Sequence, residues 1–316
     1  MCALAVADRA TPQPSPAAEP ELFLQTVPRT LVHRAAVSEV LLTGIRDDGQ
    51  DSFRVGAQWP RGHSYYRAVA QRWHDPVLLG ESIRQAVLLV SHEGLHIPLG
   101  HCFFSHTTSY AADADGILLA DRPAEVLMTA RIRDIKRRGR LVGGFDVDVE
   151  CHRDGQRIGR GHMSLTCVPA ATYRRLRGDR VDARAERSAA PPVAPETVGR
   201  RYETDVVLGT TAVERVWTLR ADPGHPVLFD HPVDHVPGMV VMEGARQAAL
   251  ATLGSPDGLA VECAITYGKF IEFATPCLVS AEAATPGPDG RQVVNVHFAQ
   301  DGATVATAAV TVVAAP

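Results

Sequence analysis

The chain has 316 residues, of which 45% are hydrophobic and 22% charged, and its formal net charge at pH 7 is −4. This composition is that of a globular protein long enough for two ordinary domains. The sequence has no basic stripe for nucleic acid and no apolar stretch of membrane-spanning length. Neither nucleic-acid binding nor insertion into a membrane is therefore expected. The six cysteines form no C-x-x-C pair, which favours reduced thiols and a cytoplasmic location.

The first 27 residues are predicted to be a disordered leader. They are rich in Pro and Ala, and their short apolar run stops at Asp8. No basic segment precedes that run, so it has the features of neither a secretory signal nor a membrane anchor.

A long buried helix is predicted after Asp75-Pro76. The stretch "VLLGESIRQAVLLVSH" (77–92) has apolar residues around most of the helical circumference. Glu81, Arg84 and Gln85 lie at i, i+3 and i+4 and therefore share one face. One interpretation is a solvated ion pair of little energetic value. Because charges on a buried helix need compensation and often mark functional sites, we favour a binding or catalytic stripe.

The end of this helix contains "HEGLH" (92–96), which fits the H-E-x-x-H pattern of zinc hydrolases. Gly94 and Pro98 form a helix-stop signal, whereas a zinc site needs this pattern in mid-helix. The extended pattern would need Gly and His where the chain has Leu99 and Cys102. We therefore expect histidines that cap carbonyls or line a pocket, with no metal and no other cofactor.

The chain repeats itself. "ESIRQA" (81–86) returns as "EGARQA" (243–248), and Gly62-His63 returns at the same spacing as Gly224-His225. Two segments, 151–168 and 298–315, each have a strand pattern, an Asp-Gly turn and a returning strand, which predicts β-hairpins. The clearest strand patterns lie at 145–151, 293–299 and 307–313.

These features predict a duplicated α+β domain, in which one long helix per copy is wrapped by an antiparallel sheet. The segment between the copies is rich in Pro, Ala and charge, which is typical of a linker. The predicted organisation is a leader (1–27), a first domain (28–175), a linker (176–199) and a second domain (200–316).

The second predicted helix follows "LFDHPVDHVPG" (228–238). His231 and His235 flank Asp234, and Pro237-Gly238 open the helix. A glycine there lets a substrate carbonyl approach the backbone N–H groups of Gly238 and Met239, which would stabilise the oxyanion of an acyl thioester reaction. The alternative is a loop that needs Pro-Gly only for its turn.

Together these stretches resemble the A-factor biosynthesis proteins of actinobacteria, which are γ-butyrolactone signalling synthases. The resemblance rests on "VHRAAVSEVLLTG", "AQWPRGH", "DPVLLGESIRQAVLLVSH", "IPLGH" and "DHPVDHVPGMVVMEGARQA". It covers roughly residues 28–316 apart from the linker. It implies two tandem hot-dog domains, which pair internally in a monomer or assemble as a homodimer.

The resemblance also implies an acyltransferase. Such enzymes join a β-ketoacyl group from acyl carrier protein to the hydroxyl of dihydroxyacetone phosphate. The ester leads to a γ-butyrolactone, butenolide or furan signal that controls secondary metabolism. A hot-dog dehydratase or thioesterase, or a non-catalytic acyl-binding regulatory module, remain the alternatives.

The residue types fit this chemistry, which needs a base, an oxyanion site and an anchor for phosphate. Our hypothesis makes Glu243 the base and Arg246 the anchor of the phosphate or of the carbonyl, although an adjacent arginine lowers the pKa of a carboxyl and weakens it as a base. Glu81 and Arg84 are expected to form a second site or to complete a shared one. The expected substrate-binding residues are Gln85, Gln247, Gly238, Met239, His231, His235, His63 and His225.

Overall fold

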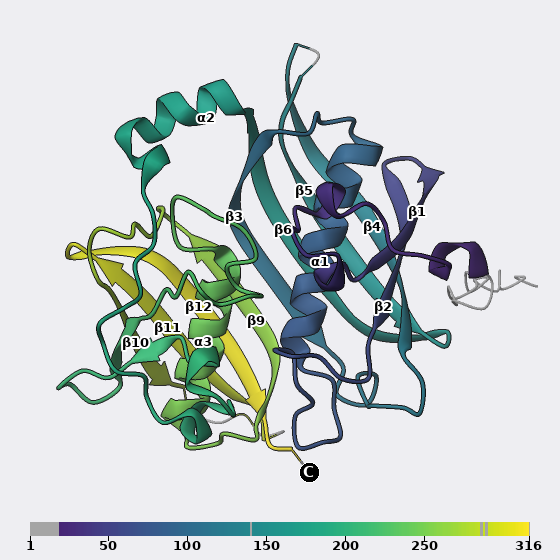
Figure 1. The fold of residues 1–316 in the computed structure, drawn as a ribbon. Helices are drawn as coiled ribbons and strands as arrows, with labels where there is room; N and C mark the ends of the chain where they lie inside the picture. The colour runs from purple at the N-terminus through teal and green to yellow at the C-terminus, as the bar shows by residue number, and fades with distance from the viewer. Residues whose placement is uncertain (1–18, 140, 285–286, 288–289, 316) are drawn as a thin grey trace, which may run out of the picture.

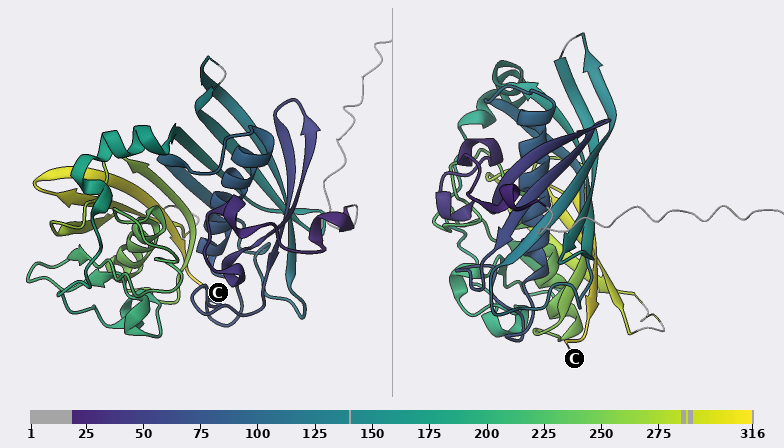
Figure 2. Two further views of the ribbon diagram at one scale, coloured as in Figure 1. Left: turned by 45° about the horizontal axis from the view of Figure 1, so that its top comes forward. Right: turned by 90° about the vertical axis from the view of Figure 1, so that its right-hand side faces the viewer.

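The computed structural model describes residues 19–315 apart from 140, 285, 286, 288 and 289. Two similar halves lie side by side, each with one long helix against an antiparallel sheet (Figure 1). Figure 2 shows that the helices cover one face of the joined sheet. This arrangement confirms the predicted α+β layout.

The strands form one twelve-stranded sheet with the order β1-β2-β4-β5-β6-β3-β9-β12-β11-β10-β8-β7. All pairings are antiparallel, and the halves join where β3 pairs with β9 at the centre. The strands of the first half are β1 (Leu42–Gly49), β2 (Ser52–Trp59), β3 (His101–Ala112), β4 (Ala124–Arg138), β5 (Leu141–Arg153) and β6 (Gln156–Pro169). Those of the second half are β7 (Leu208–Gly209), β8 (Val216–Leu219), β9 (Leu259–Tyr267), β10 (Cys277–Ala283), β11 (Gln292–Gln300) and β12 (Ala303–Val313).

Two long helices form the other layer, α1 (Pro76–Leu89) and α3 (Gly238–Leu253). Gly80 lets α1 approach the neighbouring elements, because a Cβ there would lie 2.9 Å from Tyr110 and 3.0 Å from the sulfur of Met242. The shorter helices are α2 (Ala170–Arg177), the π-helical turn η5 (Val90–Gly94) and the 3₁₀ turns η2 (Pro20–Phe23), η3 (Arg29–Val32), η4 (Val37–Glu39), η6 (Gly178–Asp182), η7 (Pro195–Val198) and η8 (Glu203–Asp205). None of the described helices has both the length and the apolar character needed to cross a membrane.

The two predicted hairpins are confirmed. β5 and β6 meet at Asp154-Gly155, and β11 and β12 meet at Asp301-Gly302. All four turn residues have positive φ angles between 50° and 78°. Positive φ at both central positions is the requirement of a type I′ turn, which explains why each copy has Asp-Gly at this point.

Residues on either side of the first predicted domain pack into the fold. Residues 1–18 of the expected leader lie outside the described residues, but residues 19–27 are packed against the first half. Leu22 is buried against Gly44 and Gly56, whose missing side chains leave room for its backbone. Residues of the expected linker 176–199 are also ordered. Pro191 and Val193 pair with the backbone beside β7, where an edge position tolerates proline.

Candidate active site

Glu81 on α1 is the centre of a buried polar cluster. Its carboxylate accepts hydrogen bonds from Arg34 (Nε, 3.1 Å), Arg84 (Nε, 2.9 Å; Nη2, 2.8 Å) and Gln85 (Nε2, 2.6 Å). We call Arg34, Glu81, Arg84 and Gln85 the first cluster.

Glu243 on α3 has the same surroundings. Arg200 donates to it through Nε (2.9 Å) and Nη2 (2.7 Å), and Arg246 donates through the same two atom types at the same distances. Gln247 also donates to this carboxylate. Arg200, Glu243, Arg246 and Gln247 form the second cluster, which the duplication relates to the first.

The glutamines of the two clusters have equivalent structural contacts. Gln85 accepts from the backbone N–H of Leu41 (3.0 Å) and donates to the carbonyl of Glu39 (2.8 Å). Gln247 bonds in the same way to Val207 (3.0 Å) and to the carbonyl of Asp205 (2.8 Å). Both side chains are fully buried, so the structure places them in backbone contacts rather than at a cavity.

Each cluster also ties the two halves together. Arg34 donates to the carbonyl of Val227 (3.0 Å), and Arg200 donates to the carbonyl of Tyr65 (2.8 Å). The sequence reasoning missed both arginines. A signal for them exists, because "VHR" (32–34) and "VGR" (198–200) stand at equivalent places before the two copies.

The two predicted G-H histidines hold the loops that receive these arginines. Nδ1 of His63 accepts from the N–H groups of Tyr65 and Tyr66, each at 3.1 Å. Nδ1 of His225 accepts from Val227 (3.2 Å) and Leu228 (3.0 Å). Neither histidine lines the cavity described below, and the contacts of both are with backbone loops.

Both cluster carboxylates are held in the ionised form. Burial opposes ionisation of Glu81, but Arg34 and Arg84 outweigh it and lower its pKa from 4.5 to about 2. Against the same opposing effect of burial, Arg200 and Arg246 hold the pKa of Glu243 well below its ordinary range. A carboxylate with so low a pKa is a weak proton acceptor at neutral pH.

These pKa values predict a loss of stability in acid. A folded-state pKa below the unfolded value stabilises the fold above pH 4.5, and that contribution disappears as the pH falls from 4.5 to about 2. We expect the midpoint of urea unfolding to drop between pH 6 and pH 3, and to drop less in Glu81→Gln. Equal midpoints at both pH values would contradict this assignment.

The environments of the two clusters differ in one respect. Every residue of α1 is buried except Arg84, whose side chain is 22% exposed, whereas the side chain of Arg246 on α3 is 4% exposed. A cavity of about 240 Å³ between the halves is lined by Arg84 and Arg34. Neither Glu243 nor Arg246 lines it. The predicted catalytic pairs are Glu81 with Arg84 and Glu243 with Arg246. Of these four residues only Arg84 lines this cavity, and Glu81 is hydrogen-bonded to it.

The start of α3 opens onto the same cavity. Pro237, the N-cap residue, makes no side-chain capping bond, and Val240 is the first residue whose N–H bonds back to Pro237. Within the described chain, the N–H groups of Gly238 and Met239 have no acceptor, and both residues line the cavity. This geometry supports the predicted oxyanion site.

The equivalent end of α1 is closed. Asp75 accepts the N–H of Val77 (2.9 Å), and Pro76 has no N–H to offer. The carboxylate of Asp75 also lies 3.6 Å from Arg200. An anionic side chain therefore occupies the position where α3 leaves two donors free.

Two His–Asp pairs face the cavity. His235 donates from Nδ1 to Asp234 (2.7 Å), and Asp234 is fixed further by Tyr173 (2.6 Å) and Arg177 (2.9 Å). Burial of Asp234 opposes its ionisation, but these hydrogen bonds lower its pKa below the usual range. Nδ1 of His235 therefore carries a proton, so Nε2 is the atom that can act as a base.

His231 is the second of these histidines. Its Nδ1 lies 3.2 Å from Asp230, which also accepts the N–H groups of Ala35 (2.5 Å) and Ala36 (2.9 Å). His231 and Arg84 are close enough to His33 to act on its pKa. This part of the cavity therefore contains Arg84 and His231, together with the Asp230 carboxylate, which is bound to two backbone N–H groups.

The "HEGLH" stretch contributes to the cavity indirectly. Nδ1 of His92 lies 2.7 Å from the carbonyl of Ile97, which can only accept, so Nδ1 carries the proton. In the neutral form of His92, Nε2 then accepts from Nε2 of His33 at 2.9 Å. Burial, followed by the nearby His92, lowers the pKa of His33 to about 4, so the ring is neutral.

The predicted helix end and carbonyl contact are both confirmed. α1 stops at Leu89, and a π-helical turn carries His92. His92 is buried whereas His96 is exposed, so the two histidines do not share one environment.

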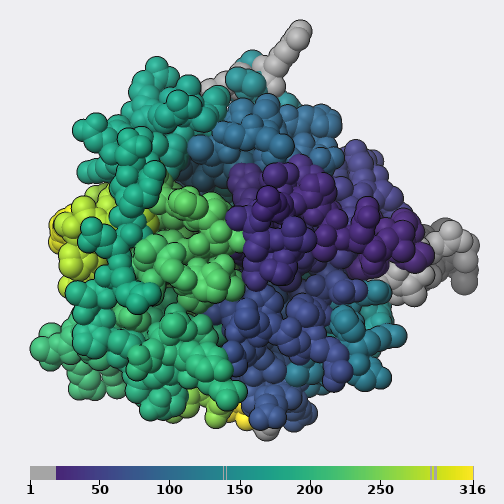
Figure 3. Space-filling view, viewed as in Figure 1, coloured from purple at the N-terminus to yellow at the C-terminus, as the bar shows by residue number. Residues whose placement is uncertain are grey.

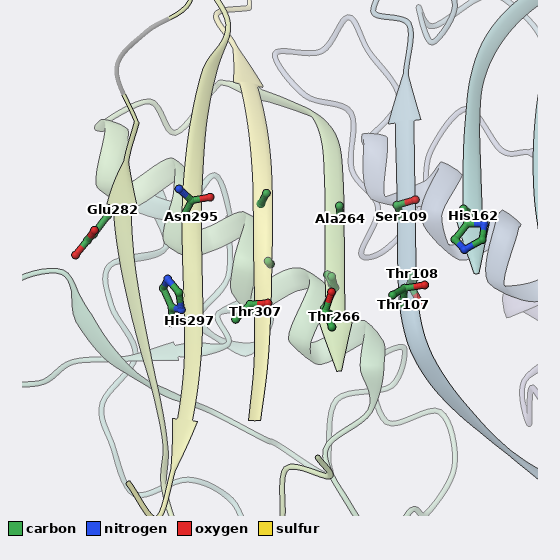
Figure 4. A pocket seen from close by; sticks show the side chains of 13 residues that line it. Thr107, Thr108, Ser109, His162, Ala264, Thr266, Glu282, Asn295, His297 and Thr307 are labelled. Atoms are coloured by element: carbon green, nitrogen blue, oxygen red, sulfur yellow. The ribbon is translucent and has the colours of Figure 1, made fainter. Parts of the chain in front are cut away.

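A larger hollow, of about 720 Å³, lies on a different part of the sheet. Figure 4 shows its lining side chains spread over neighbouring strands, among them Thr107, His162, Thr266, Asn295 and His297. It contains none of the predicted site residues. We therefore place the candidate active site in the cavity between α1 and the start of α3.

A buried helix wrapped by an antiparallel sheet, present twice, with a cavity between the copies, defines a hot-dog protein with a candidate active site. The model of the A-factor biosynthesis hotdog domain matches residues 16–169 and 181–316. The chain belongs to this family, which confirms the resemblance and the hot-dog fold.

Curated relatives point the same way. The chain is 42% identical to a 2-oxo-3-(phosphooxy)propyl 3-oxoalkanoate synthase of Streptomyces virginiae, over 89% of this chain and 95% of the relative. It is 34% identical to a synthase of the same name from Streptomyces griseus subsp. griseus, over 93% of each.

Solved structures agree on the fold. A putative oleoyl thioesterase of Lactobacillus plantarum aligns with a TM-score of 0.50 at 12% identity, over 84% of this chain and 98% of that one. The 12:0-ACP thioesterase of Umbellularia californica aligns with a TM-score of 0.50 at 10% identity, over 83% and 93%.

Proposed function

We propose that this chain is a 2-oxo-3-(phosphooxy)propyl 3-oxoalkanoate synthase that works in the cavity between its halves. It transfers a β-ketoacyl group from a thioester to the hydroxyl of dihydroxyacetone phosphate. The observation that carries the proposal is that one cavity combines a free helix start, a His–Asp pair and a partly exposed arginine. The names of the relatives supply the substrates.

The phosphate of dihydroxyacetone phosphate binds beside Arg84 and His231. Arg84 offers a guanidinium, which pairs well with phosphate oxygens, and Glu81 orients it through two hydrogen bonds. Neutral His33, which His92 orients, lines the same part of the cavity as Arg84.

The acyl thioester lies at the other end of the cavity. Its carbonyl oxygen accepts from the N–H groups of Gly238 and Met239, where the partial positive charge of α3 also acts. The acyl chain packs against the apolar wall, which consists of Val87, Leu88, Phe103, Met163, Leu165, Leu228, Met239 and Met242.

His235 acts as the base. Its Nε2 takes the proton of the substrate hydroxyl while the oxygen attacks the thioester carbon. The tetrahedral oxyanion then collapses and breaks the C–S bond, and the proton passes from His235 to the departing thiolate. Asp234 stabilises the imidazolium between these steps.

This assignment replaces the hypothesis that Glu243 is the base. Glu243 is 0% exposed, locked between Arg200 and Arg246, and away from the cavity. Its role, and that of Arg246, is to hold the second half together.

The proposal extends to the source and fate of the substrates. An acyl carrier protein in the cytoplasm delivers the β-ketoacyl chain. The phosphorylated ester feeds the formation of a γ-butyrolactone, butenolide or furan signal.

One assay separates the synthase from the alternatives. The protein is incubated with a β-ketoacyl thioester, with and without dihydroxyacetone phosphate, and products are read by mass spectrometry. The proposal requires that thiol release depends on dihydroxyacetone phosphate and that the phosphorylated ester is formed. Release without the phosphate identifies a thioesterase, and loss of water from a β-hydroxyacyl thioester identifies a dehydratase. If none of these substrates is converted, the protein is an acyl-binding module without catalytic activity.

A further inference from the structure

A basic surface lies on α2 and the turn that follows it. Between residues 170 and 187 the chain has six arginines and three acidic residues, although its overall net charge is −4. Arg177 is buried, and the other five arginines are exposed. Leu176, 66% exposed, stands among them. We call Arg174, Arg175, Leu176, Arg180 and Arg184 the α2 surface.

The charge of this surface is poorly compensated. Within the described chain, the guanidinium groups of Arg174 and Arg175 make no ion pair or hydrogen bond. Arg184 donates only to the backbone carbonyl of Ala183, and Arg180 lies 3.6 Å from Glu272 while its side chain stays 70% exposed. Such a patch attracts acidic partners and speeds their association.

The buried side of α2 is fixed to the wall of the proposed active site. Tyr173 and Arg177 both donate to Asp234, the residue that holds His235. Arg177 also lies over the ring of Phe270 at 4.3 Å, and His235 packs against the same ring at 4.6 Å. In Figure 3, the teal surface of α2 borders the green surface of the second half. The α2 surface therefore lies beside the residues that form the rim of the cavity.

The shape of the α2 surface favours a macromolecule. Its five side chains are exposed and line none of the described cavities, and α2 lies at the edge of the molecule (Figure 1). An exposed leucine surrounded by arginines matches the apolar centre and charged rim of a protein interface.

We propose that the α2 surface docks the acidic helical face of an acyl carrier protein, so that its thioester arm enters the cavity beside His235. This inference rests on the proposed function and names the surface that receives its acyl donor. Arg174 and Arg175 pair with carboxylates of the carrier, and Leu176 packs at the centre of the contact.

The test is the double variant R174E/R175E, assayed with one β-ketoacyl chain presented in two ways. With the carrier-bound thioester, we expect kcat/KM to fall by about tenfold or more, because opposite charges no longer steer the encounter. With the N-acetylcysteamine thioester, which has no carrier surface, kcat/KM stays within about twofold. The variant R174Q/R175Q gives a smaller loss of the same kind, and added salt reduces the difference.

The control variant is R122E/R215E, which changes the net charge equally at exposed arginines outside the α2 surface. This control should leave kcat/KM unchanged with both the carrier-bound and the N-acetylcysteamine thioester. Unchanged carrier-dependent rates in R174E/R175E overturn the proposal. So does an equal loss with both thioesters, or a loss with the coenzyme A thioester as large as that with the carrier. If the unaltered protein shows no phosphate-dependent release from either thioester, the proposed function fails instead.

Discussion

Replacing His235 with alanine is expected to lower kcat for ester formation by about 10²- to 10⁴-fold, the usual contribution of a positioned general base. His235 lines the cavity, and Asp234 fixes its ring through a 2.7 Å hydrogen bond to Nδ1. Its side chain is 28% exposed, and buried Asp234 keeps Tyr173 and Arg177 as partners when the histidine is removed. The melting temperature should therefore change little. The measurement is kcat with saturating acyl thioester and dihydroxyacetone phosphate.

Two further variants sharpen this result. Asp234→Asn keeps the base but loses the charge that supports the imidazolium, so we expect a smaller loss of kcat and a shifted pH profile. His96→Ala, which removes an exposed histidine outside the cavity, should retain full activity. Full activity in His235→Ala would show that another group accepts the proton.

Replacing Glu243 with glutamine is expected to destabilise the protein by about 3–5 kcal/mol, because two buried arginines lose the carboxylate to which both are hydrogen-bonded. Arg200 and Arg246 are both buried and each makes two hydrogen bonds to Glu243. The measurement is the free energy of unfolding from urea titration, together with kcat per folded molecule.

The two readouts distinguish structure from catalysis. We expect the folded fraction of Glu243→Gln to keep most of its kcat. The matched control is Glu214→Gln, in which the lost carboxylate belongs to a 92% exposed side chain, and its stability should be unchanged. A Glu243→Gln protein of normal stability that forms no ester would restore Glu243 as the base.

Much of the fold was predictable because its strongest signals are local. The apolar run from Val77 indicated a buried helix, the two Asp-Gly turns fixed the hairpins, and the repeated E-x-x-R-Q stripe related the halves. Residues 19–27 were harder to predict, because their order depends on the contact of Leu22 with Gly44 and Gly56 in a distant hairpin.

The candidate site was predictable only in part. The stripe and the Pro-Gly helix start identified residues near the cavity, but the stripe is nearly identical in both copies. What distinguishes the copies is the residue at each helix start. Asp75 closes one start with a carboxylate, whereas Pro237 leaves the other uncapped. Which copy then faces a cavity depends on packing between the halves, which no local pattern encodes.

The histidines of "HEGLH" illustrate the same limit. The helix-stop residues correctly predicted where α1 ends and that a histidine there contacts a carbonyl. The link from His92 to His33 joins residues 59 positions apart in the sequence, so it was visible only in the fold.

We expect each chain to have one working site, at Arg84, because the equivalent Arg246 is buried away from the cavity. Isothermal titration with dihydroxyacetone phosphate tests it most directly. We predict one binding site per chain, and an affinity weakened by about 10- to 100-fold in Arg84→Met, since a charged hydrogen bond contributes about 1.5–3 kcal/mol. Two sites per chain, or unchanged affinity in Arg84→Met, would contradict the claim.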